Sequence, residues 1–192
     1  MKNYLLTIAF SLTTMLNFAQ QSEHLTFKGV PIDGTLNDFV TKMTQNGFTN
    51  SGTENGKALL HWDFAGYKDC VINVSTLKQK DLVNKIEVLF TKKDLWSTLS
   101  GNYFELKQML TEKYGEPSEI VEKFDSYQPN DDNSRMYKVG MDECKYISTW
   151  QNNNGKIQLS IEHKSFINCF IKLSYSDKIN SDILKAKAKD DL

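Results

Sequence analysis

The sequence contains very little arginine. Lysine and arginine together number 23, yet Arg135 is the only arginine, and the formal net charge is −1. Lysine lacks the planar, two-pronged set of donors with which proteins hold phosphates and guanine bases. A chain so close to neutral also produces no strong field that would attract a polyanion. We therefore expect no nucleic-acid partner.

Signatures of catalysis and metal binding are also missing. The sequence has no HExxH, GxSxG, GxxxxGK[S/T], GxGxxG or CxxC motif. His24, His61 and His163 are too far apart in sequence for a local metal cluster, although His61 and His163 could face one groove beside a cysteine. Asp131-Asp132-Asn133 offers oxygens to calcium, but it lacks the glycine and distal glutamate of a calcium-binding loop. We expect no catalytic residue, metal or cofactor.

The sequence contains few cysteines, and their spacing does not indicate a disulfide framework. The three cysteines, Cys70, Cys144 and Cys169, are widely spaced and odd in number. In an oxidising compartment, one disulfide with one free thiol is an open alternative. Three buried thiols are the favoured interpretation, because free cysteine behaves as a small apolar residue.

The chain has one long apolar run, Tyr4 to Leu16, which follows Lys2 and precedes Ala19 and a polar stretch. This run has about 13 residues, whereas a membrane-spanning helix needs roughly 20. The order of charge, apolar core and small residue is typical of a secretory signal peptide. We predict a signal peptide at residues 1–19, cleavage after Ala19, and a periplasmic or secreted product. Because no cysteine lies near the cleavage site, we expect no lipid anchor. Because the apolar run is short, we expect no permanent membrane span.

Residues 20–93 show a helix followed by three strands. A short strand at 25–27 with Val30 precedes the turn 31–34. Thr35 is a suitable N-cap, and Asn46-Gly47 is a suitable helix end. Between them, apolar residues recur at i, i+3, i+4 and i+7, which predicts a helix; they are Leu36, Phe39, Val40 and Met43. Three runs then alternate between apolar and polar residues, as expected for strands with one wet face: 58–64, 70–76 and 85–90.

Residues 94–177 show a similar pattern. A helix is predicted over 94–114, with an interruption near Ser100-Gly101 and an end at Gly115-Glu116-Pro117. Its expected apolar stripe consists of Tyr103, Leu106, Met109, Leu110 and Tyr114. A strand at 118–124, a loop at 127–134 and a short helix at 135–141 follow. Three alternating runs close the domain: 145–151, 156–163 and 169–175.

The turn Asn154-Gly155 between the first two of these runs is a hairpin signal. The last residues, 178–192, are polar and are expected to form a frayed tail.

The recurrence predicts an internal duplication, with repeats at 20–93 and 94–177. The strands can be matched in two registers, one of which places Asp69–Ser75 on Asn168–Ser174. Helices beside antiparallel strands indicate an α+β fold. We expect two tandem helix-plus-antiparallel-meander repeats that form one continuous sheet, with the helices packed on one face.

Two segments carry a resemblance to known proteins. Phe27–Thr35 (FKGVPIDGT) and Leu106–Pro117, with its Leu-Lys, Leu110 and Lys-Tyr-Gly-x-Pro pattern, resemble small exported bacterial proteins. The arrangement is also similar to the tandem helix-and-sheet fold of the β-lactamase inhibitory protein and of small outer-membrane assembly lipoproteins. The lipoproteins begin with a lipid-bearing cysteine, which this chain lacks. The inhibitor-like resemblance implies that the sheet binds another protein.

Aromatic residues are the main candidates for binding. Trp62, Tyr67, Tyr146 and Trp150 lie on or beside predicted strands, and large rings on a partly exposed sheet commonly anchor recognition. Trp62 also fits the alternation of a core face, so an interior position is the competing interpretation. We expect a protein-binding or inhibitor-like module that uses its sheet face, with an undetermined oligomeric state.

A hydrolase acting on glycans is the alternative. Asp63, Glu87 and Glu162 would lie on the wet sheet face. Glycoside hydrolysis requires two carboxyl groups roughly 5 to 9.5 Å apart. The alternative therefore depends on how close the fold brings these side chains.

Overall fold

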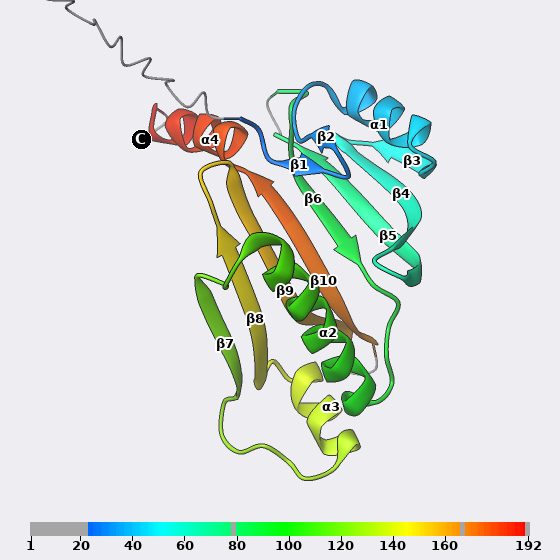
Figure 1. The fold of residues 1–192 in the computed structure, drawn as a ribbon, viewed down its shortest axis with the longest axis vertical. Coiled ribbons are helices and arrows are strands. Elements are labelled where there is room, and N and C mark those ends of the chain that lie inside the picture. The colour runs from blue at the N-terminus through cyan, green and yellow to red at the C-terminus, as the bar shows by residue number, and fades with distance from the viewer. Residues whose placement is uncertain (1–22, 78–79, 166–167, 191–192) are drawn as a thin grey trace, which may run out of the picture.

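The computed structural model describes residues 23–77, 80–165 and 168–190 (Figure 1). The predicted signal peptide and the cleavage site at Ala19 lie outside these residues. The fold is α+β, as expected, and its large antiparallel sheet has the strand order β3-β4-β5-β6-β10-β9-β8-β7. Among the described residues, no helix is both long and apolar enough to cross a membrane.

Each half of the fold combines one long helix with four strands of the large sheet. The sequence predicted three of these strands in the first half and four in the second. The first half contains α1 (Leu36–Gln45), β3 (Thr49–Glu54), β4 (Lys57–Phe64), β5 (Tyr67–Thr76) and β6 (Val83–Leu89). The second contains α2 (Trp96–Tyr114), β7 (Glu119–Phe124), α3 (Asp132–Gly140), β8 (Cys144–Gln151), β9 (Gly155–Ser165) and β10 (Asn168–Asp177). Strand β3 was missed because every residue in it is exposed and none is apolar.

The two halves join where β6 pairs with β10. Ile86 lies opposite Tyr175, and Val88 lies opposite Leu173. By their places in the strand order, β6 is equivalent to β10 and β5 is equivalent to β9. The register that matched Asp69–Ser75 on β5 with Asn168–Ser174 on β10 therefore does not correspond to this order. His61 on β4 and His163 on β9 therefore do not occupy equivalent strands.

One face of the sheet carries the core. Directly opposed residues point to the same side, so one row crosses the four central strands: Ile72, Val88, Leu173 and Leu159. Helix α1 contacts β4 and β5, and α2 contacts β9 and β10, over this buried row. The opposite side, which we call the open face, carries Val71, Leu89 and Lys172.

The first half begins as the sequence predicts. Strands β1 (Thr26–Phe27) and β2 (Val30–Pro31) form a small ribbon, turned by Lys28 and Gly29 at positive φ. The Thr35 hydroxyl accepts a hydrogen bond from Asp38 N at 3.1 Å and caps α1. The four predicted apolar positions of this helix are all buried.

Helix α2 is continuous, so the interruption predicted near Ser100-Gly101 is wrong. Its buried residues lie on both sides of Gly101 and hold the backbone against the sheet; they are Trp96, Leu99, Tyr103, Leu106 and Leu110. Packing of this kind outweighs the cost of glycine in a helix, about 1 kcal/mol. Met109, predicted to be part of the apolar stripe, is 40% exposed.

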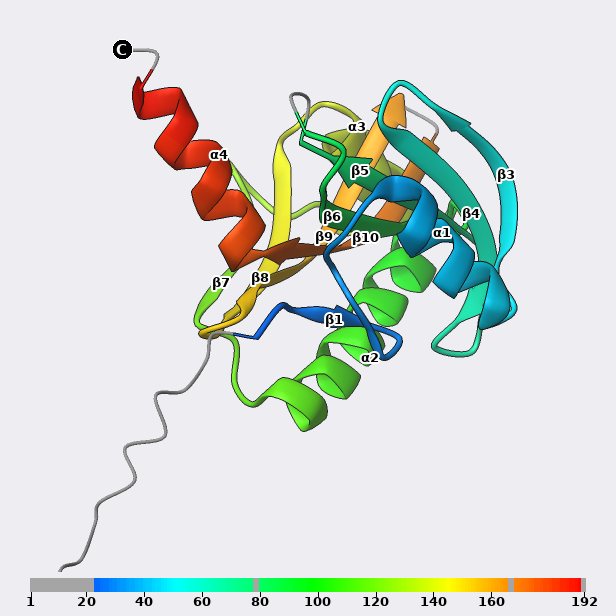
Figure 2. The same cartoon turned by 90° about the horizontal axis from the view of Figure 1, so that it is seen from above.

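The predicted frayed tail is instead a helix, α4 (Lys178–Asp190), which follows β10 directly. It contacts the ends of β6, β9 and β10 rather than lying along the sheet, and Figure 2 shows it projecting away from α2. The expectation that the helices share one face is therefore not confirmed for α4.

A buried polar cluster fixes the start of α4. Asp177, which is 0% exposed, accepts hydrogen bonds from Leu25 N and Asn180 N, each at 2.8 Å. The side-chain amide of Asn180 donates to the carbonyl oxygens of Ile32 and Val83. These bonds join the N-terminal segment, β6 and the C-terminal helix.

Replacement of Asp177 by alanine tests this cluster. Two buried N–H groups would lose their acceptor, and each such loss costs 1–3 kcal/mol, so we expect the free energy of unfolding to fall by about 3 kcal/mol. Urea denaturation followed by circular dichroism measures the change. Asp182→Asn is the control: Asp182 is half-exposed on α4, and the loss of its surface ion pair with Lys178 should change the midpoint only slightly. Equal midpoints for wild type and Asp177→Ala would show that the cluster contributes little.

Candidate binding pocket at helix α3

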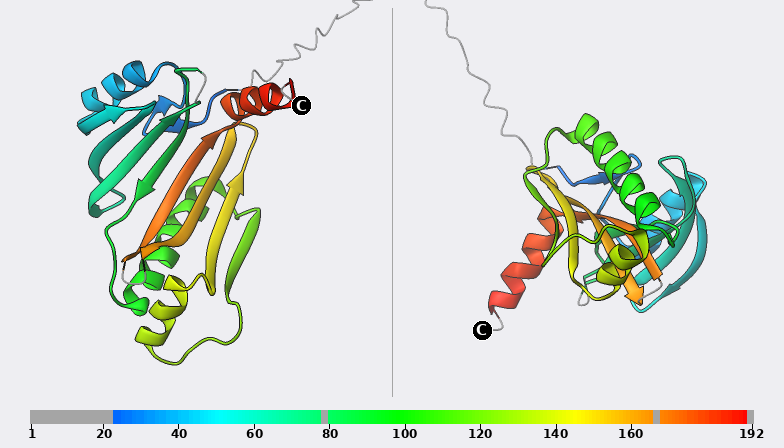
Figure 3. Two further views of the ribbon diagram at one scale, coloured as in Figure 1. Left: turned by 180° about the vertical axis from the view of Figure 1, so that it is seen from behind. Right: turned by 90° about the horizontal axis from the view of Figure 1, so that it is seen from below.

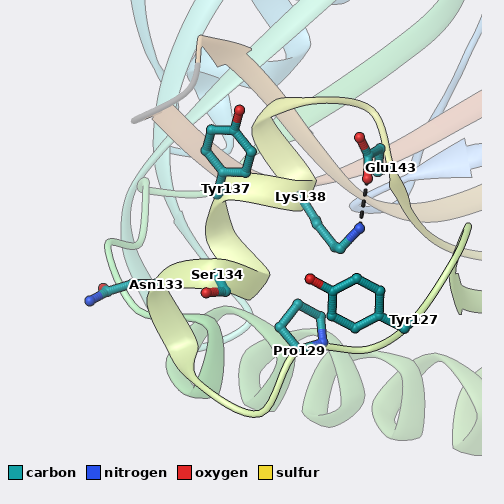
Figure 4. A pocket seen from close by; sticks show the side chains of 7 residues that line it. All are labelled: Tyr127, Pro129, Asn133, Ser134, Tyr137, Lys138 and Glu143. Atoms are coloured by element: carbon teal, nitrogen blue, oxygen red, sulfur yellow. Dashed lines mark hydrogen bonds and ion pairs between the residues drawn. The ribbon is translucent and has the colours of Figure 1, made fainter.

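The connection between β7 and β8 forms a pocket of about 360 Å³ (Figure 4). It combines two tyrosines with charged and small polar side chains: Tyr127, Pro129, Asn133, Ser134, Tyr137, Lys138 and Glu143. We call it the α3 pocket. A larger hollow over the β3–β4 hairpin, about 700 Å³, has no aromatic lining residue.

Aspartates fix the start of α3. The Asp131 carboxylate accepts a hydrogen bond from Ser134 N at 2.9 Å and caps the helix, which lowers the pKa of Asp131. Asp132 accepts bonds from Ser97 Oγ and Ser97 N, at 2.6 and 3.1 Å, and these lower its pKa. Ser97 lies in the first turn of α2, whose N-cap Leu95 offers no side-chain acceptor. Helix α3 therefore begins three residues before the predicted position and caps its neighbour.

The two carboxylates have structural contacts at the start of α3. Both already accept hydrogen bonds from backbone or hydroxyl donors. Within the described residues, no group of three or more His, Cys, Asp or Glu side chains is arranged to hold a metal ion.

The loop before α3 is held by cationic side chains. Arg135 donates through Nε to the carbonyl oxygen of Pro129 at 2.6 Å, so the single arginine has a structural contact. Lys138 Nζ donates to Ser126 Oγ at 3.0 Å and to Glu143 Oε2 at 2.6 Å. The same ammonium lies 4.6 Å from the centre of the Tyr127 ring, a favourable cation–π geometry. Figure 4 shows Lys138 near Tyr127 and Glu143, with the Lys138–Glu143 ion pair dashed.

Two aromatic rings are exposed on the loop and helix that these contacts stabilise. Tyr127 is 68% exposed and Tyr137 is 61% exposed, whereas Lys138 is buried. Aromatic rings offer a large contact area and lose little conformational freedom on binding. The arrangement is suited to recognition of a partner group.

Lys138 is poorly suited to accept a proton in the pocket. The hydrogen bond to Glu143 raises the pKa of Lys138 and keeps its amine protonated. A general base requires a pKa near the working pH. Lys138 is therefore not a candidate general base.

The four predicted binding aromatics do not form an exposed patch. Tyr146 and Trp150 are buried, and the Trp150 indole N–H donates to Gly115 O at 2.8 Å. Trp62 is half-buried and stacks on Phe48 with ring centres 5.0 Å apart. Tyr67 is half-buried and donates through its hydroxyl to Glu105 at 2.6 Å. All four lie on the side of the sheet that α1 and α2 cover, so they do not give the open face an aromatic surface.

Two of the three candidate carboxylates, Glu87 and Glu162, lie far apart along the sheet. Glu87 lies opposite Ser174 and Glu162 lies opposite Phe170, four residues apart on β10, which is about 13 Å along a strand. Each is paired with a lysine: Glu87 with Lys85 at 2.5 Å, and Glu162 with Lys172 at 2.8 Å. Asp63 accepts a hydrogen bond from Asp69 N in the β4–β5 turn. Glu87 and Glu162 are too far apart for the two-carboxylate mechanism.

The histidines lie in separate places. His24 lies 3.1 Å from Asp177, and His163 lies 2.9 Å from Asp142. His61 is on the open face of β4, opposite Val71. His163 lies opposite Cys169 in the sheet, but His61 does not join them in one groove.

No protein-family model, curated protein or solved structure matches this chain. The functional conclusion below therefore depends on the geometry of the chain itself.

All three cysteines are buried free thiols, in agreement with the favoured interpretation. Burial raises the pKa of Cys144 from 9.0 to about 12, and it also raises the pKa of Cys70 and of Cys169. The folded state favours the protonated Cys144 thiol. The contribution of this thiol to the free energy of unfolding is therefore fully present below pH 9, and it is lost as the pH rises toward 12.

Thiol labelling tests this burial. With a disulfide reagent at pH 8, we expect the native protein to react at least about 100-fold more slowly than the urea-unfolded chain, because only an exposed thiolate attacks. Unfolding midpoints should also fall as the pH rises above 9, and less steeply for Cys144→Ala. Rapid labelling of Cys144 in the folded protein would contradict the buried position.

Proposed function

We propose that this protein is an exported, non-catalytic module that binds another protein through the α3 pocket. The observation that carries the proposal is the pair of exposed rings, Tyr127 and Tyr137, beside the ion pair that buried Lys138 forms with half-exposed Glu143. Tyrosine is strongly enriched among the residues that dominate protein–protein binding energies.

The rigidity of the pocket supports this role. Asp131, Asp132, Arg135 and Lys138 each hold one part of the loop or helix in place. A surface that is already ordered loses less conformational entropy when a partner binds. The free protein can therefore present both rings near their binding positions.

The proposed partner contact differs from the one expected from sequence. The open face remains a broad surface, but the expected aromatic anchors are on its reverse side. The inhibitor-like resemblance supports a binding role for the protein, while the exposed tyrosines favour the α3 pocket as the contact.

The proposal is tested by comparing wild type with Tyr127→Ala/Tyr137→Ala. Each purified protein is immobilised and exposed to the envelope fraction of its source cells, and bound proteins are quantified by mass spectrometry. The partner is then purified, and its affinity for each variant is measured by calorimetry. Loss of an anchoring ring typically costs at least 2 kcal/mol, so we expect the double variant to weaken binding by about 30-fold or more.

Leu59→Ala is the matched control, because Leu59 is 37% exposed on the open face. This variant should retain the partner at the wild-type level. Equal recovery by wild type and the double tyrosine variant would contradict binding through the α3 pocket. Loss of binding by Leu59→Ala alone would place the contact on the open face.

A further inference from the structure

The two edges of the large sheet differ in how they are protected. Strands β3 and β7 lie at opposite ends (Figure 3). At β3, the register shifts between Asn50 and Gly52, where the Asn50 side chain accepts a hydrogen bond from Gly52 N. A bulge of this kind, on a wholly polar strand, prevents pairing with another chain. The β3 edge is therefore blocked.

The β7 edge has no such irregularity. All six of its residues pair with β8 in an unbroken register. Phe124 lies opposite Cys144, and Asp125 N donates to Glu143 O at 2.9 Å. Because hydrogen-bonded and non-hydrogen-bonded pairs alternate in an antiparallel ladder, the N–H and C=O groups of Ile120, Glu122 and Phe124 face the free edge. Ile120 is 49% exposed beside them.

The charges on β7 have a self-complementary order. Glu119, Val121 and Lys123 point to the same side of the sheet, because side chains alternate along a strand. Glu119 is therefore two residues before Val121, and Lys123 is two residues after it. An antiparallel copy centred on Val121 would place each acid opposite a base, whereas a copy centred on Glu122 would place two acids together.

A second positive charge opposite Lys123 favours this arrangement. Lys123 lies directly opposite Lys145 on β8, and like charges in that position are destabilising. Lys145 lies 3.7 Å from Asp125, while Lys123 has no ion-pair partner within the described part of the chain. An additional acid would neutralise this pair.

We propose that two copies of this chain associate through β7, antiparallel about a twofold axis at Val121. Glu119 of each copy then pairs with Lys123 of the partner subunit, and the two large sheets become continuous. Glu122, already bonded to Lys107 at 2.6 Å and Tyr103 at 3.2 Å, lies opposite Ile120 of the partner subunit. The outward backbone groups of Ile120 and Glu122 form the new ladder bonds.

The dimer proposal does not depend on the proposed binding function. A dimer would, however, change the strength with which a partner protein is bound. Each β7 leads into one α3 pocket, so a dimer would carry two pockets in one assembly. A target with two binding sites would then be held more tightly than by one pocket alone.

Charge reversal tests the pairing. The dimer dissociation constant of the purified protein is measured by sedimentation equilibrium over a wide range of concentrations. Lys123→Glu and Glu119→Lys each place like charges opposite one another, and we expect either change to weaken the dimer by about tenfold or more. The double variant Glu119→Lys/Lys123→Glu restores opposite charges and should recover wild-type affinity within about threefold.

A backbone substitution provides a second test. Ile120→Pro removes an outward N–H that does not bond to β8, so it should abolish the dimer and leave the fold intact by circular dichroism. Hydrogen exchange at Ile120, Glu122 and Phe124 should slow as the wild-type concentration rises. Glu54→Lys on the β3 edge is the control and should change neither measurement.

Two results would overturn the proposal. One is a monomer at every concentration up to about 1 mM, which is beyond the range of specific weak interfaces. The other is a dimer whose affinity is the same in wild type, Lys123→Glu and the charge-swapped double variant. Either result leaves binding through the α3 pocket to its own test.

Discussion

The pairing of β6 with β10 determines most of the architecture. It joins the last strand of each half, so the buried row that includes Val88 and Leu173 continues across both halves. The helices α1 and α2 then cover parts of one core. Because the last strands meet in the centre, the first strands, β3 and β7, become the two edges. The position of the proposed dimer contact is therefore a consequence of this central pairing.

The buried cluster around Asp177 secures the same junction from its end. Hydrogen bonds from Leu25 N and Asn180 N reach one carboxylate, and Asn180 in turn bonds to Val83 O at the start of β6. A buried carboxylate is favourable only when its hydrogen bonds are satisfied. The cluster thus stabilises the one arrangement in which the N-terminal segment, β6 and α4 meet.

The sequence predicted the elements whose residues have a strong apolar period. Helix α1 and the strands β4, β5, β8, β9 and β10 follow their patterns closely. Strand β3 has no such pattern, although Asn55-Gly56, both at positive φ, is a hairpin signal that could have located it. The exposure of the aromatic candidates could not be predicted for a related reason. Trp62 and Trp150 occupy the same alternation as core residues, and alternation alone cannot separate a ring under a helix from a ring in solvent. The α3 pocket could not be foreseen, because it depends on contacts between residues far apart in sequence, such as Ser97 with Asp132.

The two halves differ most in the connection between their first two strands of the large sheet. In the first half, a tight turn at Asn55-Gly56 connects β3 to β4. In the second half, the corresponding connection, from β7 to β8, contains the loop with Tyr127 and all of α3. A short turn is enough to join two neighbouring antiparallel strands, so the longer connection is not needed to complete the sheet. Its bracing by Asp131, Arg135 and Lys138 instead holds two exposed rings in fixed positions beside a regular edge strand. The β7–β8 segment therefore carries both proposed contacts, one with a partner protein and one with a second copy of the chain.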